Sequence, residues 1–160
     1  MSHENEEIPT VGLGFYWDDL KVGQKFKTVG RTVTEADITN FIGVTGMTEV
    51  LFNNYEFLKT ESAIKGRPAP GALTYAFAEG LLVQSTMQGT GFAFLNMTLD
   101  VKAPVLAGDT IHVECEVMEI RPTSKGGRGL VRTMNKVVNQ RGEVVMTYNP
   151  LRMMKGRNAK

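Results

Sequence analysis

Reactive and redox-active side chains are scarce in this chain of 160 residues. It holds one cysteine, Cys115, and two histidines, His3 and His112. A single cysteine cannot form an internal disulfide, and the sequence has no cysteine cluster with metal-ligand spacing. Cys115 lies within a strand-like pattern, which predicts a small core residue. The sequence therefore offers no disulfide framework, no metal-binding motif, and no serine or cysteine nucleophile with a histidine partner.

An excess of charge of either sign is also missing. The 18 basic and 17 acidic side chains give a net charge of +1, so nothing in the charge favours nucleic acid or an anionic membrane as a partner. The N-terminal residues are acidic and polar, unlike a signal peptide, and the longest apolar run is short for a bilayer. We therefore expect a cytoplasmic protein. We also expect a single domain, because 160 residues can bury a sizeable core.

The most informative segment begins at Arg67-Pro68-Ala69-Pro70-Gly71 and continues as an almost uninterrupted apolar helix to about residue 87. It has too few polar residues to leave a solvated face. A helix that is apolar all round is predicted to be buried all round. Everything that follows it has the alternating pattern of strands.

Shorter elements flank this helix on both sides. Thr34 begins a helix with Asp37 three positions later, a spacing close to that of a capping box. The chain is divided into a flexible leader (1–14), one domain (15–153) and a basic tail (154–160). Within the domain we predict strand 25–33, helices 35–43 and 55–64, loop 44–54, strands 92–101 and 111–117, and a hairpin of 130–139 with 143–153.

This order of elements resembles the hotdog fold, an α+β fold in which an antiparallel sheet wraps one long buried helix. In detail the chain resembles the MaoC-like branch, the (R)-specific enoyl-CoA hydratases and acyl dehydratases. The resemblance covers residues 15–153 and rests on five motifs in the right order: 22–26, 32–38, 70–73, 102–105 with 107–110, and 139–145. It implies an acyl-CoA substrate, no cofactor beyond the coenzyme A of that substrate, and a homodimer or higher homo-oligomer.

One departure from the family concerns catalysis. The hydratases carry an Asp directly after the glycine of the 44–54 loop and a His five residues beyond it, and this pair acts as acid and base on water. The matching positions here are Met47 and Phe52, neither of which can transfer a proton. The pair that the resemblance would imply is therefore absent.

Three other features could supply chemistry. Unpaired N–H groups at Gly71 could hold a thioester oxygen, although glycine is also common punctuation at a helix start. Glu49 is the preferred general base, with Asn53 and Asn54 orienting water or substrate; the alternative is a loop carboxylate that faces solvent. Glu79 is the rival carboxylate, which we expect to pair with a basic residue or to reach a dimer interface.

The residues expected around the substrate form an apolar and a basic group. The apolar group predicts a hydrophobic acyl chain and comes from the loop and the helix start: Met47, Phe52, Ala72 and Leu73. The basic group would meet the phosphates of coenzyme A, unless these are simply solvated side chains: Arg67, Arg121, Lys125 and Arg128.

Three functions remain open at this point. The preferred one is a lyase, the hydration of an enoyl-CoA or the dehydration of a 3-hydroxyacyl-CoA, by a non-standard acid–base arrangement. The second is an acyl-CoA thioesterase with Glu49 or Glu79 as base. The third is an inactive hotdog subunit that binds acyl-CoA or pairs with an active partner.

Overall fold

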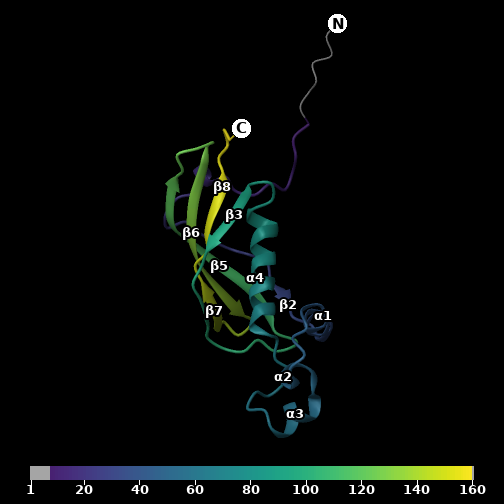
Figure 1. Ribbon diagram of the computed structural model, residues 1–160. Coiled ribbons are helices and arrows are strands. Elements are labelled where there is room, and N and C mark those ends of the chain that lie inside the picture. The colour runs from purple at the N-terminus through teal and green to yellow at the C-terminus, as the bar shows by residue number, and fades with distance from the viewer. Residues whose placement is uncertain (1–7, 160) are drawn as a thin grey trace.

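An antiparallel sheet curls along helix α4 (Gly71–Thr86) in the computed structural model, which describes residues 8–159 (Figure 1). Its eight strands lie in five rows, because β1 and β2 share one row, β7 and β8 another, and β4 and β3 a third. The rows run in the order β1/β2, β5, β6, β7/β8, β4/β3. The strands are β1 (Lys25–Lys27), β2 (Arg31–Thr32), β3 (Gly91–Asn96), β4 (Leu99–Val101), β5 (Thr110–Pro122), β6 (Arg128–Asn139), β7 (Val144–Tyr148) and β8 (Leu151–Lys155). This is the α+β plan of a hotdog fold, as predicted.

The core lies between α4 and the inner face of the sheet. The predicted alternation in β5 is confirmed, since Ile111, Val113, Cys115 and Val117 are at most 4% exposed. Leu73, Ala78, Leu81 and Leu82 form the facing side of α4. Each fully buried aliphatic side chain of this kind stabilises the fold by about 1.5–3 kcal/mol. Burial also raises the pKa of the Cys115 thiol to about 11, so it is an inert core residue.

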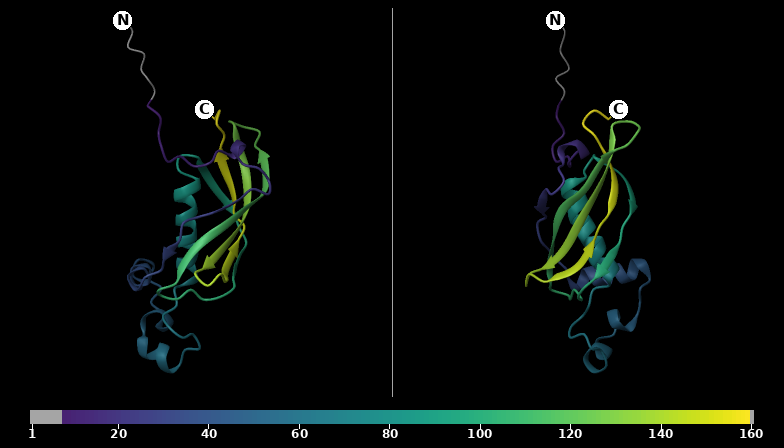
Figure 2. Two further views of the ribbon diagram at one scale, coloured as in Figure 1. Left: turned by 180° about the vertical axis from the view of Figure 1, so that it is seen from behind. Right: turned by 90° about the vertical axis from the view of Figure 1, so that its left-hand side faces the viewer.

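The prediction that α4 is buried all round is wrong for the single chain. The sheet lies along one side of the helix only (Figure 2). Residues one turn apart form an exposed apolar stripe on the other side, which comprises Ala72, Ala76, Gly80 and Val83. The apolar pattern therefore corresponds to two faces of α4. One packs against the sheet, and the other is exposed within the described residues.

Three short helices precede α4: α1 (Glu35–Thr45), α2 (Val50–Asn53) and α3 (Tyr55–Thr60). The capping box of α1 is present, with Thr34 Oγ1 accepting from Asp37 N at 3.1 Å and Asp37 Oδ2 accepting from Thr34 N at 2.8 Å. The helix ends at Gly46, whose φ of 73° favours glycine. The helices α2 and α3 lie beyond the N-terminal end of α4 (Figure 1).

Several predicted bounds are wrong, and in three of them irregular residues interrupt a long predicted strand. Strand 25–33 is split around Thr28, whose hydroxyl accepts from Val113 N at 3.0 Å. Strand 143–153 is split at Asn149 and Pro150, since proline has no N–H for the sheet ladder. Strand 92–101 is likewise two strands, helix 55–64 ends at Thr60, and α2 occupies part of the predicted loop.

The two ends of the described chain dock against the body. Gly14 N and Phe15 N donate to Gln88 O and Thr86 O, both at 2.8 Å, so the chain passes close to the C-terminal end of α4. Residues 1–7 of the predicted leader, including His3, and residue 160 of the tail lie outside the described residues. At the other end, β8 continues through Lys155, and Arg157 pairs with Asp19 at 2.6 Å. No described helix combines the length and apolar character needed to cross a membrane.

Candidate active site

A cavity of about 240 Å³ lies at the N-terminal end of α4. Helix α2, the approach to α4, the segment after β4 and strand β7 each contribute to its wall. The lining residues are Leu51, Phe52, Ile64, Pro68, Ala69, Gly71, Thr74, Val101, Ala103, Pro104, Val105 and Met146. Gly71 and Phe52, which the sequence analysis singled out separately, therefore share one cavity.

Backbone donors at the start of α4 are free to bind a ligand. Leu73 N and Thr74 N both donate to Pro70 O, at 2.9 and 3.2 Å. Within residues 8–159, no hydrogen bond uses Gly71 N or Ala72 N. These two N–H groups lie at the positive end of the helix dipole, where a partial negative charge on a ligand oxygen is stabilised.

The cavity wall carries no titratable side chain. Eleven of its twelve residues are apolar or glycine, and the hydroxyl of Thr74 is the one polar side-chain group. An acyl chain in this cavity would therefore meet an apolar surface, while a charged acyl group would find no partner for its buried charge. Proton transfer in this cavity requires a group that reaches it from outside the wall.

The predicted general base Glu49 and one of its helpers, Asn54, act as helix caps in the structure. Glu49 Oε2 accepts from Leu51 N at 2.8 Å, which makes Glu49 the N-cap of α2. Asn54 Oδ1 accepts from Phe57 N at 3.0 Å and caps α3. Asn53 is the exposed last residue of α2. None of the three lines the cavity.

Arg67 has a different place from the one predicted, because it is 8% exposed and internally bonded. Its Nε donates to Phe52 O at 2.9 Å, and its Nη1 donates to Glu35 Oε2 at 2.5 Å and to Thr39 Oγ1 at 3.1 Å. The hydrogen bond from Arg67 holds the pKa of the Glu35 carboxyl below its usual value, although burial opposes this, and Tyr55 adds a further hydrogen bond. Arg67 thus ties α1 and α2 to the approach to α4, instead of facing a solvent-borne phosphate.

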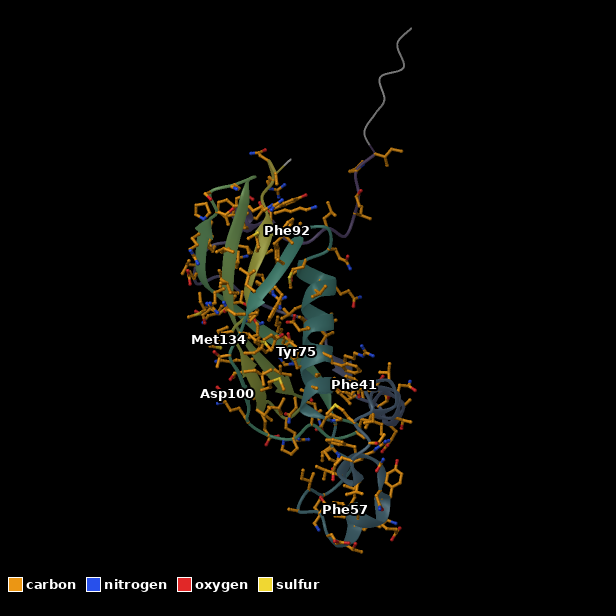
Figure 3. All side chains as sticks on the ribbon, viewed as in Figure 1. Phe41, Phe57, Tyr75, Phe92, Asp100 and Met134 are labelled. Carbon is orange, nitrogen blue, oxygen red and sulfur yellow. The ribbon has the colours of Figure 1, made fainter. Side chains whose placement is uncertain are left out.

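The other predicted substrate-binding residues do not gather at the cavity. Met47 is 36% exposed in the loop, Ala72 lies on the exposed stripe of α4, and Leu73 is in the core. The basic group at the β5–β6 hairpin lies at the opposite end of the molecule, where Arg128 stacks over Phe92 at 3.7 Å (Figure 3). Arg121 pairs there with Glu119, and Lys125 lies in the turn. One chain alone therefore does not bring Arg121, Lys125 and Arg128 to the cavity.

Glu79 pairs with a basic residue, one of the two outcomes expected for it. Arg152 Nη2 donates to both Glu79 carboxylate oxygens, at 2.6 and 2.5 Å, and Tyr148 OH donates to Oε1 at 2.9 Å. The Glu79 and Arg152 side chains are only 16% and 12% exposed. Tyr75 of α4 packs edge-on against the Tyr148 ring, and Figure 3 places it between the helix and the sheet. These partners leave the carboxylate poorly suited to act as a base.

A larger hollow of about 320 Å³ lies on the outer face of the sheet. Its charged side chains come from β1, β5 and β6, and Lys25 pairs there with Glu116 at 3.6 Å. His112 lies on the same outer face and contacts Glu114 at 3.2 Å. Of these two, the cavity at Gly71 is the better candidate for a reaction, because it joins a helix-start residue with a free N–H to an apolar wall.

Sequence reasoning missed one residue at this site, Thr74, and it missed the structural role of Arg67, whose hydrogen bonds link α1 and α2 to the approach to α4 (the Arg67 clamp). For Thr74 a signal existed, since it lies one turn after Gly71 and hence on the same face of a helix. For Arg67 no local signal existed, because Glu35 and Phe52 are distant in sequence. Metal ligands are absent as well: among residues 8–159 no three His, Cys, Asp or Glu side chains are placed to hold a metal ion.

Several proteins similar to this chain are named as hydratases or dehydratases. An (R)-specific enoyl-CoA hydratase of Rhodospirillum rubrum is 32% identical over 110 residues, which cover 69% of this chain and 74% of that protein. The crystal structure of a MaoC-like dehydratase from Rhodospirillum rubrum superposes with a TM-score of 0.80 at 29% identity, covering 90% of this chain and 99% of that one.

The fold itself also occurs in tandem in a larger protein. Rv0216 of Mycobacterium tuberculosis, which has a double hotdog fold, superposes with a TM-score of 0.81 at 21% identity, over 92% of this chain and 46% of that one. The sequence model of one family, described as the MaoC like domain, matches residues 19–139. The chain therefore belongs to the MaoC-like domain family, with a hotdog fold.

Proposed function

We propose that this protein is a hydratase or dehydratase of acyl-CoA thioesters with an apolar acyl group. The observation that carries the proposal is the shared cavity of Gly71 and Phe52, in which a helix-start residue with a free N–H meets an apolar wall. The enoyl-CoA hydratase of Rhodospirillum rubrum, a relative of this chain, supports the same reaction class.

In the proposed reaction, Gly71 N–H holds the thioester carbonyl oxygen. Hydration adds the oxygen of water to carbon 3 of the enoyl group and a proton to carbon 2, and dehydration reverses both steps. Negative charge gathers on the thioester oxygen during either step, and a helix N-terminus stabilises it there. One such donor typically contributes about 10²–10³ in rate.

Glu49 is the proposed proton-transfer group. It is the N-cap of α2, two residues before Leu51 and three before Phe52 of the cavity wall. To act, its carboxylate must leave Leu51 N and turn toward the cavity, so the proposal requires a change of side-chain conformation. Asn53 and Asn54 are proposed to orient water at the same place.

Turnover of the purified protein tests this function. Hydration of crotonyl-CoA and longer enoyl-CoAs removes their ultraviolet absorbance, and we expect slow but measurable loss that Glu49→Gln abolishes. Hydrolysis of saturated acyl-CoAs without hydration would replace the proposal with the thioesterase function. Binding of acyl-CoA without any turnover would identify an inactive subunit, for which the apolar wall of the cavity is the favouring observation.

We also propose that the protein is a homodimer in which the exposed stripe of α4 and the edge strand β3 face a second copy. Phe92 and Phe94 of β3 are 50% and 45% exposed, and an unpaired strand edge invites pairing. A two-fold contact along this edge would bring the β5–β6 hairpin of the second copy toward the cavity, with its Arg121, Lys125 and Arg128. Light scattering should give twice the chain mass, and Ala76→Arg should give the mass of one chain.

A further inference from the structure

The hydroxyl of Thr74 differs from the other helical hydroxyls of the molecule. Thr45, Thr60, Ser85 and Thr86 each donate to the carbonyl four residues earlier, at 2.6 to 2.8 Å. This internal bond is the usual way to satisfy a hydroxyl in a helix. The hydroxyl of Thr39 accepts from Arg67 Nη1 at 3.1 Å instead. Within residues 8–159, no hydrogen bond involves Thr74 Oγ1.

The unpaired hydroxyl belongs to a side chain that is otherwise enclosed. Thr74 is 3% exposed and lines the cavity, on the same face of α4 as Gly71. The fully enclosed polar atoms without a partner are those of Thr90 and Asn135, so Thr74 Oγ1 still borders open space. Because the rest of Thr74 is buried, that space is the cavity.

A buried hydroxyl without a partner is costly, and this one can both donate and accept. Gly71 N–H and Thr74 Oγ1 are the polar groups that one face of α4 presents to the cavity. They lie one helical turn apart, so one ligand with two nearby oxygens could reach both. A 3-hydroxyacyl thioester has that form, because its hydroxyl oxygen lies two carbons from the thioester carbonyl.

We propose that Thr74 is a specificity-determining residue that hydrogen-bonds the oxygen on carbon 3 of the acyl chain. This inference rests on the proposed function and narrows its substrate class. A cavity that satisfies Thr74 through a substrate hydroxyl discriminates against a saturated acyl chain, which would leave that hydroxyl unpaired. The same contact would hold the attacking water during hydration.

Calorimetric titration of the full-length protein with 3-hydroxybutyryl-CoA and with butyryl-CoA tests the proposal. Thr74→Val removes the hydroxyl at nearly constant volume, whereas Thr74→Ser keeps it. Thr86→Val is the matched control, because Thr86 lies on the same helix, is buried, and bonds its own helix at 2.7 Å. We expect Thr74→Val to lower the affinity for 3-hydroxybutyryl-CoA about 3- to 10-fold. Its affinity for butyryl-CoA should be unchanged or higher.

The expected pattern also requires Thr74→Ser and Thr86→Val to bind both ligands as the natural protein does. If Thr74→Val lowers the affinity for both ligands equally, or for neither, the proposed role of Thr74 is overturned while the acyl-CoA site remains in place. Failure of the unchanged protein to bind either thioester would overturn the proposed function itself. Circular dichroism of each variant separates these outcomes from misfolding, and Thr74→Ser retains a test if Thr74→Val does not fold.

Discussion

The polar groups in the first and third turns of α4 differ in whether they have hydrogen-bond partners. At the first turn, Gly71 N and Thr74 Oγ1 border a cavity and have no partner in the described chain. At the third turn, Glu79 accepts three hydrogen bonds from Arg152 and Tyr148. Glu79, the charged residue of α4, thus has a structural role. The groups that are free to bind a ligand lie in the first turn, which carries no charged side chain.

The partners of Glu79 explain why it looks catalytic in the sequence and yet is structural. A carboxylate inside a protein needs a cation and further donors, and Arg152 and Tyr148 supply both. Burial, and then the neighbouring Glu79 carboxylate, raises the pKa of the Tyr148 hydroxyl, so Tyr148 stays a neutral donor. A buried charge with a complete set of partners is a poor indicator of catalysis.

The largest effect is expected from adding acid–base chemistry to the uncharged end. Replacing Met47 by Asp and Phe52 by His would supply the pair at the spacing that the family uses, and Phe52 already lines the cavity. Positioned acid–base groups contribute about 10²–10⁴ in rate. Crotonyl-CoA hydration by the double variant should rise accordingly, with Phe52→His alone as control. A folded double variant with no gain on any enoyl-CoA would show that either the alignment of the 44–54 loop or the acyl-thioester site itself is wrong.

The next effect comes from breaking the pair at the third turn. Glu79→Gln should lower the free energy of unfolding by about 3–5 kcal/mol, because it leaves Arg152 charged and mostly buried. The double variant Glu79→Met with Arg152→Met should recover most of that loss. Urea denaturation measures both. If Glu79→Gln instead keeps its stability and loses turnover, Glu79 is a catalytic residue and the third turn of α4 is not purely structural.

Acid should loosen the cavity wall through Glu35. Its pKa is lowered in the folded state, so its contribution is complete above its unfolded pKa of about 4.3 and is lost as the pH falls through the folded value. Glu35 is half exposed, which limits the contribution to less than about 1 kcal/mol. Between about pH 5 and 3, the unfolding free energy should fall less in Glu35→Gln than in the natural protein.

Glu56→Gln is the matched control for this pH series, because it removes an exposed carboxylate from α3 that is paired with Lys59. It should leave the Arg67 clamp intact. Equal pH slopes for Glu35→Gln and the natural protein would mean that the Glu35–Arg67 contact contributes nothing to stability.

The smallest effect should come from adding a single methyl group. A Cβ at Gly71 would meet Val101 Cγ2 at an ordinary 3.7 Å, so Gly71→Ala should fold while narrowing the cavity. Gly43→Ala in α1 is the control, since nothing lies within 4 Å of its new methyl. Gly43→Ala should gain up to about 1 kcal/mol in stability without a change in acyl-CoA affinity, whereas Gly71→Ala should weaken binding a few-fold. Equal affinities in the two variants would place the acyl group elsewhere.

The sequence predicted regular elements well, because their signals are local. The alternation from Ile111 to Val117 and the capping box at Thr34 depend on neighbours two or three residues away. The break at Thr28 was not predicted, because it depends on a contact across the sheet. The break at Asn149 had a local signal in Pro150 that the sequence analysis did not use, and a contact from another segment accompanies it. For Asn149 that contact is Oδ1 accepting from Thr98 N at 2.7 Å.

The sequence analysis singled out some of the residues of the candidate site and missed the structural roles of others. Gly71, Phe52 and an apolar wall follow from helix punctuation and from the resemblance. The roles of Glu49 and Asn54 as caps did not follow, because a cap and a catalytic group look alike in a loop of irregular pattern. The partners of Glu79 and Arg67 are contributed by segments far along the chain, and spacing in the sequence does not reveal them.

The pairing of β1 with β5 has a consequence for how the protein is made. Lys25 lies opposite Glu116, so the first strand leaves the ribosome about 90 residues before its partner. At ordinary elongation rates that interval is roughly 5 to 20 s. In the last part of that interval, the apolar helix α4 has been synthesised while β5 is still incomplete, so the nascent chain exposes its future core. Synthesis of this small domain should therefore depend on chaperones more strongly than its size suggests.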